Sequence, residues 1–166
     1  SSIYMERKDV NMKRNVFFII AIVCLFFAVP PLDAWADPSP PTASGDRNEI
    51  FANGTPLLIM EEGSDDDRVK TTIYIDTNGD GELNEGEQSL REAGIENAPA
   101  NASDLGLYSI YGGSKEEAYT GDTKITMRGG HVSSLIGGGY NSTADITGNT
   151  SITVTGGDTD VYGGGT

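Results

Sequence analysis

The chain has 166 residues, of which 25 are Asp or Glu and 11 are Lys or Arg, so its formal net charge is −14. A chain of this length has room for one ordinary domain or for two small ones. Its acidity excludes nucleic acid and anionic membranes as partners, because both would repel it. It has one cysteine, Cys24, so no internal disulfide can form, and the fold must be stabilised by packing, repeats or bound metal.

The first 36 residues have the pattern of a secretory signal. A basic Met-Lys-Arg segment at 12–14 precedes 14 apolar residues at 16–29, and Ala-Trp-Ala at 34–36 matches the small-x-small rule for cleavage. A membrane-spanning helix needs about 20 apolar residues, so this run is too short. We therefore expect residues 1–36 to comprise upstream residues and a cleavable signal helix. The protein is then secreted or lies on a bacterial cell surface, and it meets the membrane only during export.

Residues 37–48, DPSPPTASGDRN, follow the predicted cleavage site and are rich in proline and polar residues. They have no periodic apolar pattern, so we predict a disordered linker. The leader holds four of the basic and three of the acidic residues, which leaves seven basic and 22 acidic residues in 37–166, a net charge of −15. Bound calcium would relieve part of this self-repulsion.

Residues 49–104 are predicted to form a small β module. Residues 56–60 (PLLIM) and 70–75 (KTTIYI) are rich in apolar and β-branched side chains, which favour strands. The acidic tract between them, residues 61–68 (EEGSDDDR), lacks the spacing of a metal site and predicts a solvated hairpin loop. Further along the module, residues 88–93 (QSLREA) favour one or two helical turns.

Residues 76–87, DTNGDGELNEGE, have the ligand spacing of a twelve-residue calcium loop. Calcium prefers six to eight oxygen ligands, and such a loop supplies them from positions 1, 3, 5, 7, 9 and 12. Position 6, where the chain turns sharply, is Gly81. Position 7 contributes its carbonyl, and position 9 often acts through a water. Ca²⁺ is therefore the predicted cofactor, and its predicted ligands are Asp76, Asn78, Asp80, Glu82, Asn84 and Glu87.

The surroundings of this loop differ from those of a calcium sensor. An apolar strand at 73–75 enters it, whereas the loop of an EF-hand is entered by a helix. Gln88 follows the last ligand, at a place where the exiting helix of an EF-hand usually has an apolar residue. This loop after a strand resembles the B-type repeats of serine-aspartate-repeat adhesins of Gram-positive bacteria. The resemblance is confined to the residues around the loop, and it implies a calcium ion that rigidifies a β-rich stalk.

An internal repeat occupies the last third of the chain. Residues 121–130 (GDTKITMRGG) align with residues 148–157 (GNTSITVTGG) at an offset of 27. Two short strands per repeat with glycine corners predict the first coils of a parallel β-helix, or β-solenoid, over residues 105–166. Stacking of the coils would place Ile152 beside Ile125. The predicted fold class is therefore mainly β.

The repeats resemble the Gly-rich repeats of secreted bacterial adhesins and autotransporter passengers. This resemblance covers residues 108–166 and rests on the rhythm of the repeat rather than on a site motif. Because the chain ends within a third repeat, we expect it to be a fragment of a longer surface protein. The resemblances imply a structural or adhesive protein stabilised by calcium, without enzymatic activity. Its expected partners are calcium and a glycan or protein of a host or neighbouring cell.

Two alternatives remain open. Parallel β-helices also include polysaccharide lyases and glycosidases, which use clustered carboxylates. The candidates for such chemistry are Asp145, Asp158 and Asp160, with His131 aligned to Asp158 one repeat earlier. No Lys or Arg stands near them in the last repeat, so we predict that they are solvated turn residues. The second alternative is a calcium-dependent protein-binding module, although dockerins, which have similar loops, carry two of them.

Overall fold

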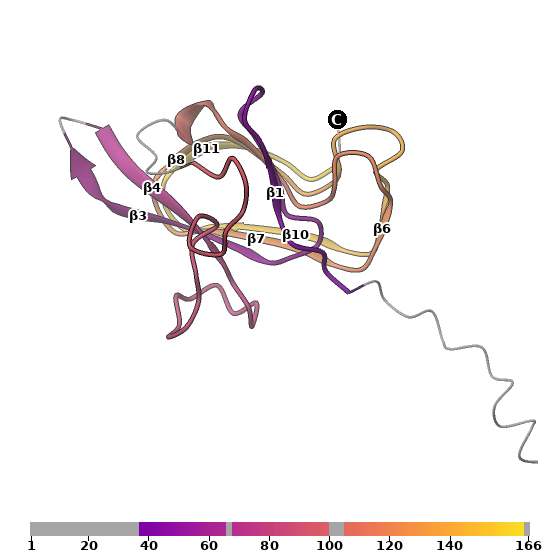
Figure 1. The fold of residues 1–166 in the computed structure, drawn as a ribbon, viewed down its shortest axis with the longest axis horizontal. Coiled ribbons are helices and arrows are strands. Elements are labelled where there is room, and N and C mark those ends of the chain that lie inside the picture. Colours follow the sequence, from indigo (N-terminus) through magenta and orange to yellow (C-terminus); the bar gives the residue numbers. More distant parts are fainter. Residues whose placement is uncertain (1–36, 66–67, 100–104, 165–166) are drawn as a thin grey trace, which may run out of the picture. The chain divides into compact units, whose positions relative to one another are not determined.

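The structure is a computed structural model that describes residues 37–65, 68–99 and 105–164 (Figure 1). The predicted signal segment, residues 1–36, lies outside the described residues. The described part is mainly β and contains one 3₁₀ helix, Leu105–Leu107, and no α-helix, so the mainly β fold class is confirmed. Within this part of the chain, no element is a helix with the length and hydropathy needed to cross a bilayer.

The first large sheet has five strands, and all but one of its neighbouring pairs are parallel. The exception is the first pair, which is antiparallel. In spatial order, its strands are β1 (Thr42–Ser44), β2 (Glu49–Phe51), β5 (Ser109–Tyr111), β8 (His131–Ile136) and β11 (Asp158–Tyr162).

The second large sheet has four strands, and a separate two-stranded sheet consists of β6 (Tyr119–Thr120) and β9 (Ile146–Thr147). In spatial order, the four strands are β10 (Thr150–Val154), β7 (Thr123–Met127), β3 (Leu57–Asp65) and β4 (Arg68–Ile75). The first three are parallel, and β4 forms the predicted antiparallel hairpin with β3. The hairpin is therefore confirmed.

The repeat stacks in the register that the sequence alignment predicts. Each residue of β7 pairs in parallel with the residue 27 positions later in β10, so Ile152 lies beside Ile125. In the five-stranded sheet the same offset joins His131 of β8 to Asp158 of β11, but an irregularity after this pair changes the offset to 26 for the remaining pairs of the two strands. Figure 1 shows the orange and yellow segments of the repeat following one another side by side. Through this pairing, the strands of one repeat supply backbone hydrogen-bond partners for the strands of the next.

The hydrophobic core lies between the two large sheets and is built from alternate residues of their strands. Position in the stack decides how deeply a repeat residue is buried. Ile125 of the inner strand β7 is 1% exposed, whereas its repeat equivalent on the edge strand β10 is only half-buried. The buried members of the core are Ile50, Ala52, Leu57, Ile59, Ile73, Leu90, Ile110, Ile125, Met127, Val132 and Leu135.

The loop module and the repeats are not separate domains, in contrast to the predicted division at residue 104. Strand β3 pairs with β7, and β2 pairs with β5, so residues on both sides of that position share both large sheets and one core. The chain from residue 36 onward forms one compact unit. The physical reason is that the strands before residue 104 complete the backbone hydrogen bonds at an edge that the first repeat would otherwise expose.

Two segments predicted as irregular contain strand. The predicted disordered linker, residues 37–48, includes β1, which pairs with β2 and thereby becomes the edge of the five-stranded sheet. The acidic tract of the hairpin, residues 61–68, is not simply a loop, because β3 and β4 remain paired within it. Pairing is interrupted between Glu61 and Ser64, where Gly63 has a φ of 103°. Backbone pairing thus outweighs the polar composition of both segments.

Candidate metal site

The predicted calcium loop begins where β4 ends, and its first residue is buried. Asp76 directly follows β4 and is 0% exposed. Its backbone N–H donates to the carbonyl of Pro56 at 3.0 Å. Its carboxylate turns into the loop, where Oδ1 accepts a hydrogen bond from the N–H of Asp80 at 3.1 Å and Oδ2 accepts one from Gly81 at 2.9 Å. Asp76 therefore anchors the loop to the sheet.

Glu87, the last predicted ligand, closes the loop from its other end. Its Oε1 accepts from the N–H of Thr77 and its Oε2 from the N–H of Asn84, each at 2.9 Å. A carboxylate oxygen has two lone pairs, so each of these bonds leaves one for a cation. The last residue of a calcium loop coordinates with both oxygens. The placement of Glu87 fits that role.

The remaining predicted ligands surround Asp80. The Oδ1 of Asn78 accepts from the N–H of Asp80 at 3.0 Å, and Oδ1 of Asp80 accepts from the N–H of Glu82 at 2.8 Å. The amide nitrogen of Asn84 donates to Oδ2 of Asp80 and to the carbonyl of Glu82, both at 3.1 Å. The carbonyl of Glu82 therefore faces the other ligands. Hydrogen bonds thus connect the six predicted ligands within the loop, but the carboxylates of Asp76, Asp80 and Glu87 do not converge on one point as a cluster of three acids.

Hydrogen bonding keeps Asp80 ionised. The N–H of Glu82, followed by the amides of Asn84 and Asn78 and then the charge of Lys124, holds the pKa of the Asp80 carboxyl below its usual value. A carboxylate whose charged form is stabilised at this position favours a divalent cation. Because the amide nitrogen of Asn84 faces Asp80, binding would require this amide to turn its oxygen inward.

The donor set mixes carboxylates with amide and carbonyl oxygens. Among the described residues, no three His, Cys, Asp or Glu side chains converge closely enough to hold a metal by themselves. Half of the predicted ligands are instead the side chains of Asn78 and Asn84 and the carbonyl of Glu82. A hard cation such as Ca²⁺ accepts all of these oxygens, so the residues fit it in number and in chemistry.

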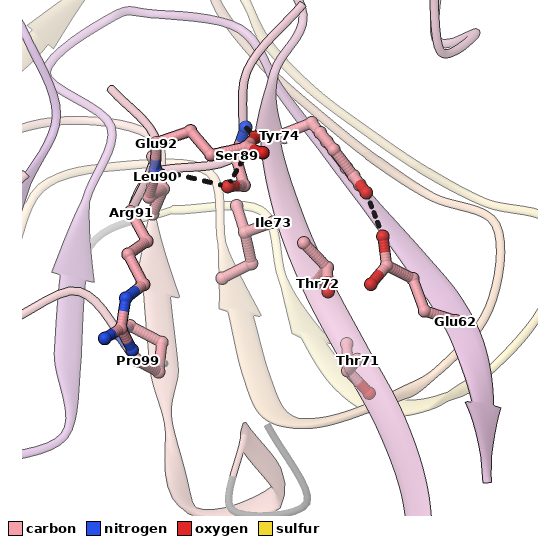
Figure 2. Close-up of a pocket in the computed structure, with 10 residues that line it drawn as sticks. All are labelled: Glu62, Thr71, Thr72, Ile73, Tyr74, Ser89, Leu90, Arg91, Glu92 and Pro99. Carbon is pink, nitrogen blue, oxygen red and sulfur yellow. Dashed lines mark hydrogen bonds between the residues drawn. The ribbon is translucent and has the colours of Figure 1, made fainter. Parts of the chain in front are cut away.

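A cavity of about 440 Å³ lies along β4, next to the turn that follows the loop (Figure 2). Ser89 and Glu92 form part of its wall. The N–H and the hydroxyl of Ser89 donate to the Glu92 carboxylate at 3.0 and 2.9 Å, which holds the two side chains together. Residues 88–93, predicted as one or two helical turns, form a single turn in which the N–H of Ala93 donates to the carbonyl of Ser89 at 3.0 Å. None of the predicted site residues lines this cavity. The Ser-x-x-Glu pattern could have located its wall.

Tyr74 lines this cavity, and its hydroxyl donates to the carboxylate of Glu62 (Figure 2). Burial, followed by this hydrogen bond and the charges of Glu62 and Glu92, raises the pKa of Tyr74 from 10.0 to about 12. The folded state thus holds the phenol proton more tightly than the unfolded chain does. The resulting stabilisation is complete below about pH 10 and is lost as the pH rises to about 12.

We expect an ultraviolet titration of the wild type, minus that of Tyr74→Phe, to show one phenol ionising near pH 12. Glu62→Gln removes a negative charge beside the phenol, so it is expected to move this transition toward lower pH. A difference titration centred near pH 10, unchanged by Glu62→Gln, would contradict the contact.

The carboxylates considered for catalysis lie on the surface. The side chain of Asp158 is 90% exposed, and its Oδ2 is 3.8 Å from Nε2 of His131. Asp160 is also exposed and pairs with Ser134 through the backbone of β11 and β8. Asp145 is exposed in the corner before β9. Within the described chain, these three carboxylates belong to no cluster of potential metal ligands.

The chain matches no known protein-family model, and no curated protein or solved structure is significantly similar to it. The chemistry of the loop and its contacts with the sheet are therefore the features that bear on function.

Proposed function

We propose that this chain is part of a secreted or cell-surface bacterial protein with a structural or adhesive role. Its repeats form a β-solenoid, and calcium bound at residues 76–87 stabilises it. The observation that carries this proposal is the loop itself. Six oxygen ligands at the spacing of a calcium loop lie within residues 76–87 and are connected by hydrogen bonds of that loop, which follows the edge strand β4.

The parallel register of the repeats supports the solenoid. The four-stranded sheet and the two-stranded sheet both use the offset of 27 residues, which is the relation expected between successive coils. Within each repeat, a glycine-rich corner joins a strand of the four-stranded sheet to a strand of the five-stranded sheet. A rigid stack of this kind suits a stalk or an adhesive surface, for which a glycan or a protein on a host or neighbouring cell is the proposed partner.

The strength of calcium binding in extracellular modules suits a stabilising ion. Such modules have dissociation constants of about 10⁻⁴–10⁻³ M. With calcium at about ten times the dissociation constant, mass action adds about 1.4 kcal/mol to the free energy of unfolding. That amount stabilises a local structure but is too small to drive a large conformational switch. The proposed ion is therefore permanent at extracellular concentrations and is not a messenger.

Thermal melting of the chain in calcium and in chelator tests the proposal. For a compact unit of this size, we expect calcium to raise the melting temperature by about 5 °C. Magnesium at the same concentration is the control for ionic strength, and it is expected to shift the melting temperature less because it requires closer octahedral ligands. Identical melting curves in calcium and chelator would refute the metal site.

A further inference from the structure

Two basic side chains attach the predicted calcium loop to the repeat. Lys124 lies in β7, and Arg128 directly follows that strand. The ammonium of Lys124 donates to the carbonyl of Gly79. The guanidinium of Arg128 donates to the carbonyl of Gly81 at 3.4 Å and also forms an ion pair with the carboxylate of Glu82. These contacts join residues 45 and 47 positions apart in the chain. We call Lys124 and Arg128 the clamp.

The clamp and the predicted cation use different groups of the loop. The clamp binds the carbonyls at loop positions 4 and 6 and the side chain at position 7, whereas the predicted ligand at position 7 is the backbone carbonyl of Glu82. The side chain of Glu82 is therefore held outward while its carbonyl faces the other ligands. The loop can thus bind a cation and the clamp at the same time.

Between the two cations the loop touches β7 at Thr126, beside a pocket of about 300 Å³ that the loop and the strands line together. Thr126 lies between Lys124 and Arg128, is 5% exposed and has a buried hydroxyl oxygen without a hydrogen bond. A Cβ atom added to Gly81, whose φ is 77°, would lie 3.0 Å from Cγ2 of Thr126. The backbone of the loop therefore packs directly on the outer face of β7.

The repeat shows that the clamp is specific to the coil that contacts the loop. The positions of Lys124 and Arg128 are taken by Ser151 and Thr155 one repeat later. The apolar and threonine positions keep their character, because Ile152 and Thr153 occupy the positions of Ile125 and Thr126 in the next repeat. The two cations are therefore additions to the repeat pattern, and they occur where the loop is seated.

We propose that the clamp couples calcium occupancy of the loop to the stability of the repeat stack. Strand β7 lies between β3 and β10, so an ion that orders the loop also holds β7 and, through it, the next coil. This inference rests on the proposed calcium site. By linkage, the clamp raises the affinity of the loop for calcium by the same free energy as bound calcium adds to the clamp contacts.

Hydrogen exchange with mass-spectrometric detection tests the coupling. Exchange of peptides that cover β7 and β10 is compared in calcium and chelator for the wild type and for Lys124→Met/Arg128→Met. Arg91→Met/Lys115→Met removes two charges elsewhere and is the matched control. Terbium luminescence or calorimetry with calcium alone measures binding to each variant, and circular dichroism in chelator measures folding.

In the wild type and the control, calcium at 20 times its dissociation constant is expected to slow exchange in β7 up to about 20-fold, if opening of β7 releases the ion. In the clamp variant, calcium still binds, but the protection of β7 is expected to be lost. Equal protection in all three proteins, or no protection in a wild type that binds calcium, overturns the coupling. A wild type that binds neither calcium nor terbium overturns the proposed function instead.

If the double variant does not fold, Lys124→Met and Arg128→Met are measured singly, and each is expected to reduce the protection of β7. Full protection in both single variants overturns the coupling.

Discussion

Replacing Ile125 with alanine is expected to lower the free energy of unfolding by about 2–5 kcal/mol, because it leaves a cavity in a packed core. Ile125 is 1% exposed and lies between Leu57 of β3 and Ile152 of β10. The same change at Ile152 removes the same atoms from the equivalent repeat position. Since Ile152 is only half-buried, we expect it to cost less than half as much.

Urea denaturation followed by circular dichroism measures both variants. The midpoint is expected to fall far more for Ile125→Ala than for Ile152→Ala, with the slope of the transition unchanged in both. This pair is informative because the two residues have the same side chain and the same position in the repeat, while only Ile125 has a strand on both sides. Equal losses of stability would show that the repeat containing β10 is buried as deeply as the repeat before it, contrary to the structure.

Replacing Asp76 with alanine is expected to have two separable effects. In chelator, it removes the acceptor of the bonds from the N–H groups of Asp80 and Gly81 and leaves a buried gap, which is expected to cost about 2–3 kcal/mol. In calcium, it also removes the first proposed ligand of the loop, so the additional stabilisation of about 1.4 kcal/mol is expected to be lost. The wild type and the variant should therefore differ more in calcium than in chelator.

Asp76→Asn is the control, since it keeps one oxygen acceptor but removes the charge. We expect it to retain more stability than Asp76→Ala in chelator, while calorimetry shows weak or no calcium binding in both. If Asp76→Ala binds calcium as tightly as the wild type, the loop does not use its first position as a ligand. A difference in stability that is the same with and without calcium would lead to the same conclusion.

The candidate site could be predicted because it is local. All six proposed ligands lie within residues 76–87, and their spacing follows from the covalent length of the loop and the coordination needs of the ion. The register of the repeat was predictable for a similar reason. Once residues 121–130 and 148–157 are aligned, stacking in parallel leaves only one offset that keeps Ile125 beside Ile152.

The pairing of the preceding strands could not be read in the same way. Nothing in residues 56–60 specifies that β3 pairs with β7 as well as with β4, because an apolar strand presents the same backbone groups to any neighbour. Strand β1 was missed since Thr42–Ser44 has no apolar period and is extended only because β2 lies beside it. The clamp was missed because Lys124 and Arg128 meet the loop across more than 40 residues.

The mainly β character, the spacing of the proposed calcium ligands and the offset of the repeat follow from the sequence alone, because each depends on neighbouring residues or on a copy of the same pattern. Tertiary structure decided that the loop module and the repeats share one core, and it seated the loop on β7. Such contacts follow from which sheet edges and faces remain to be covered once the local structure has formed. Which segment covers each edge or face depends on all the segments that could do so, and therefore on the whole fold.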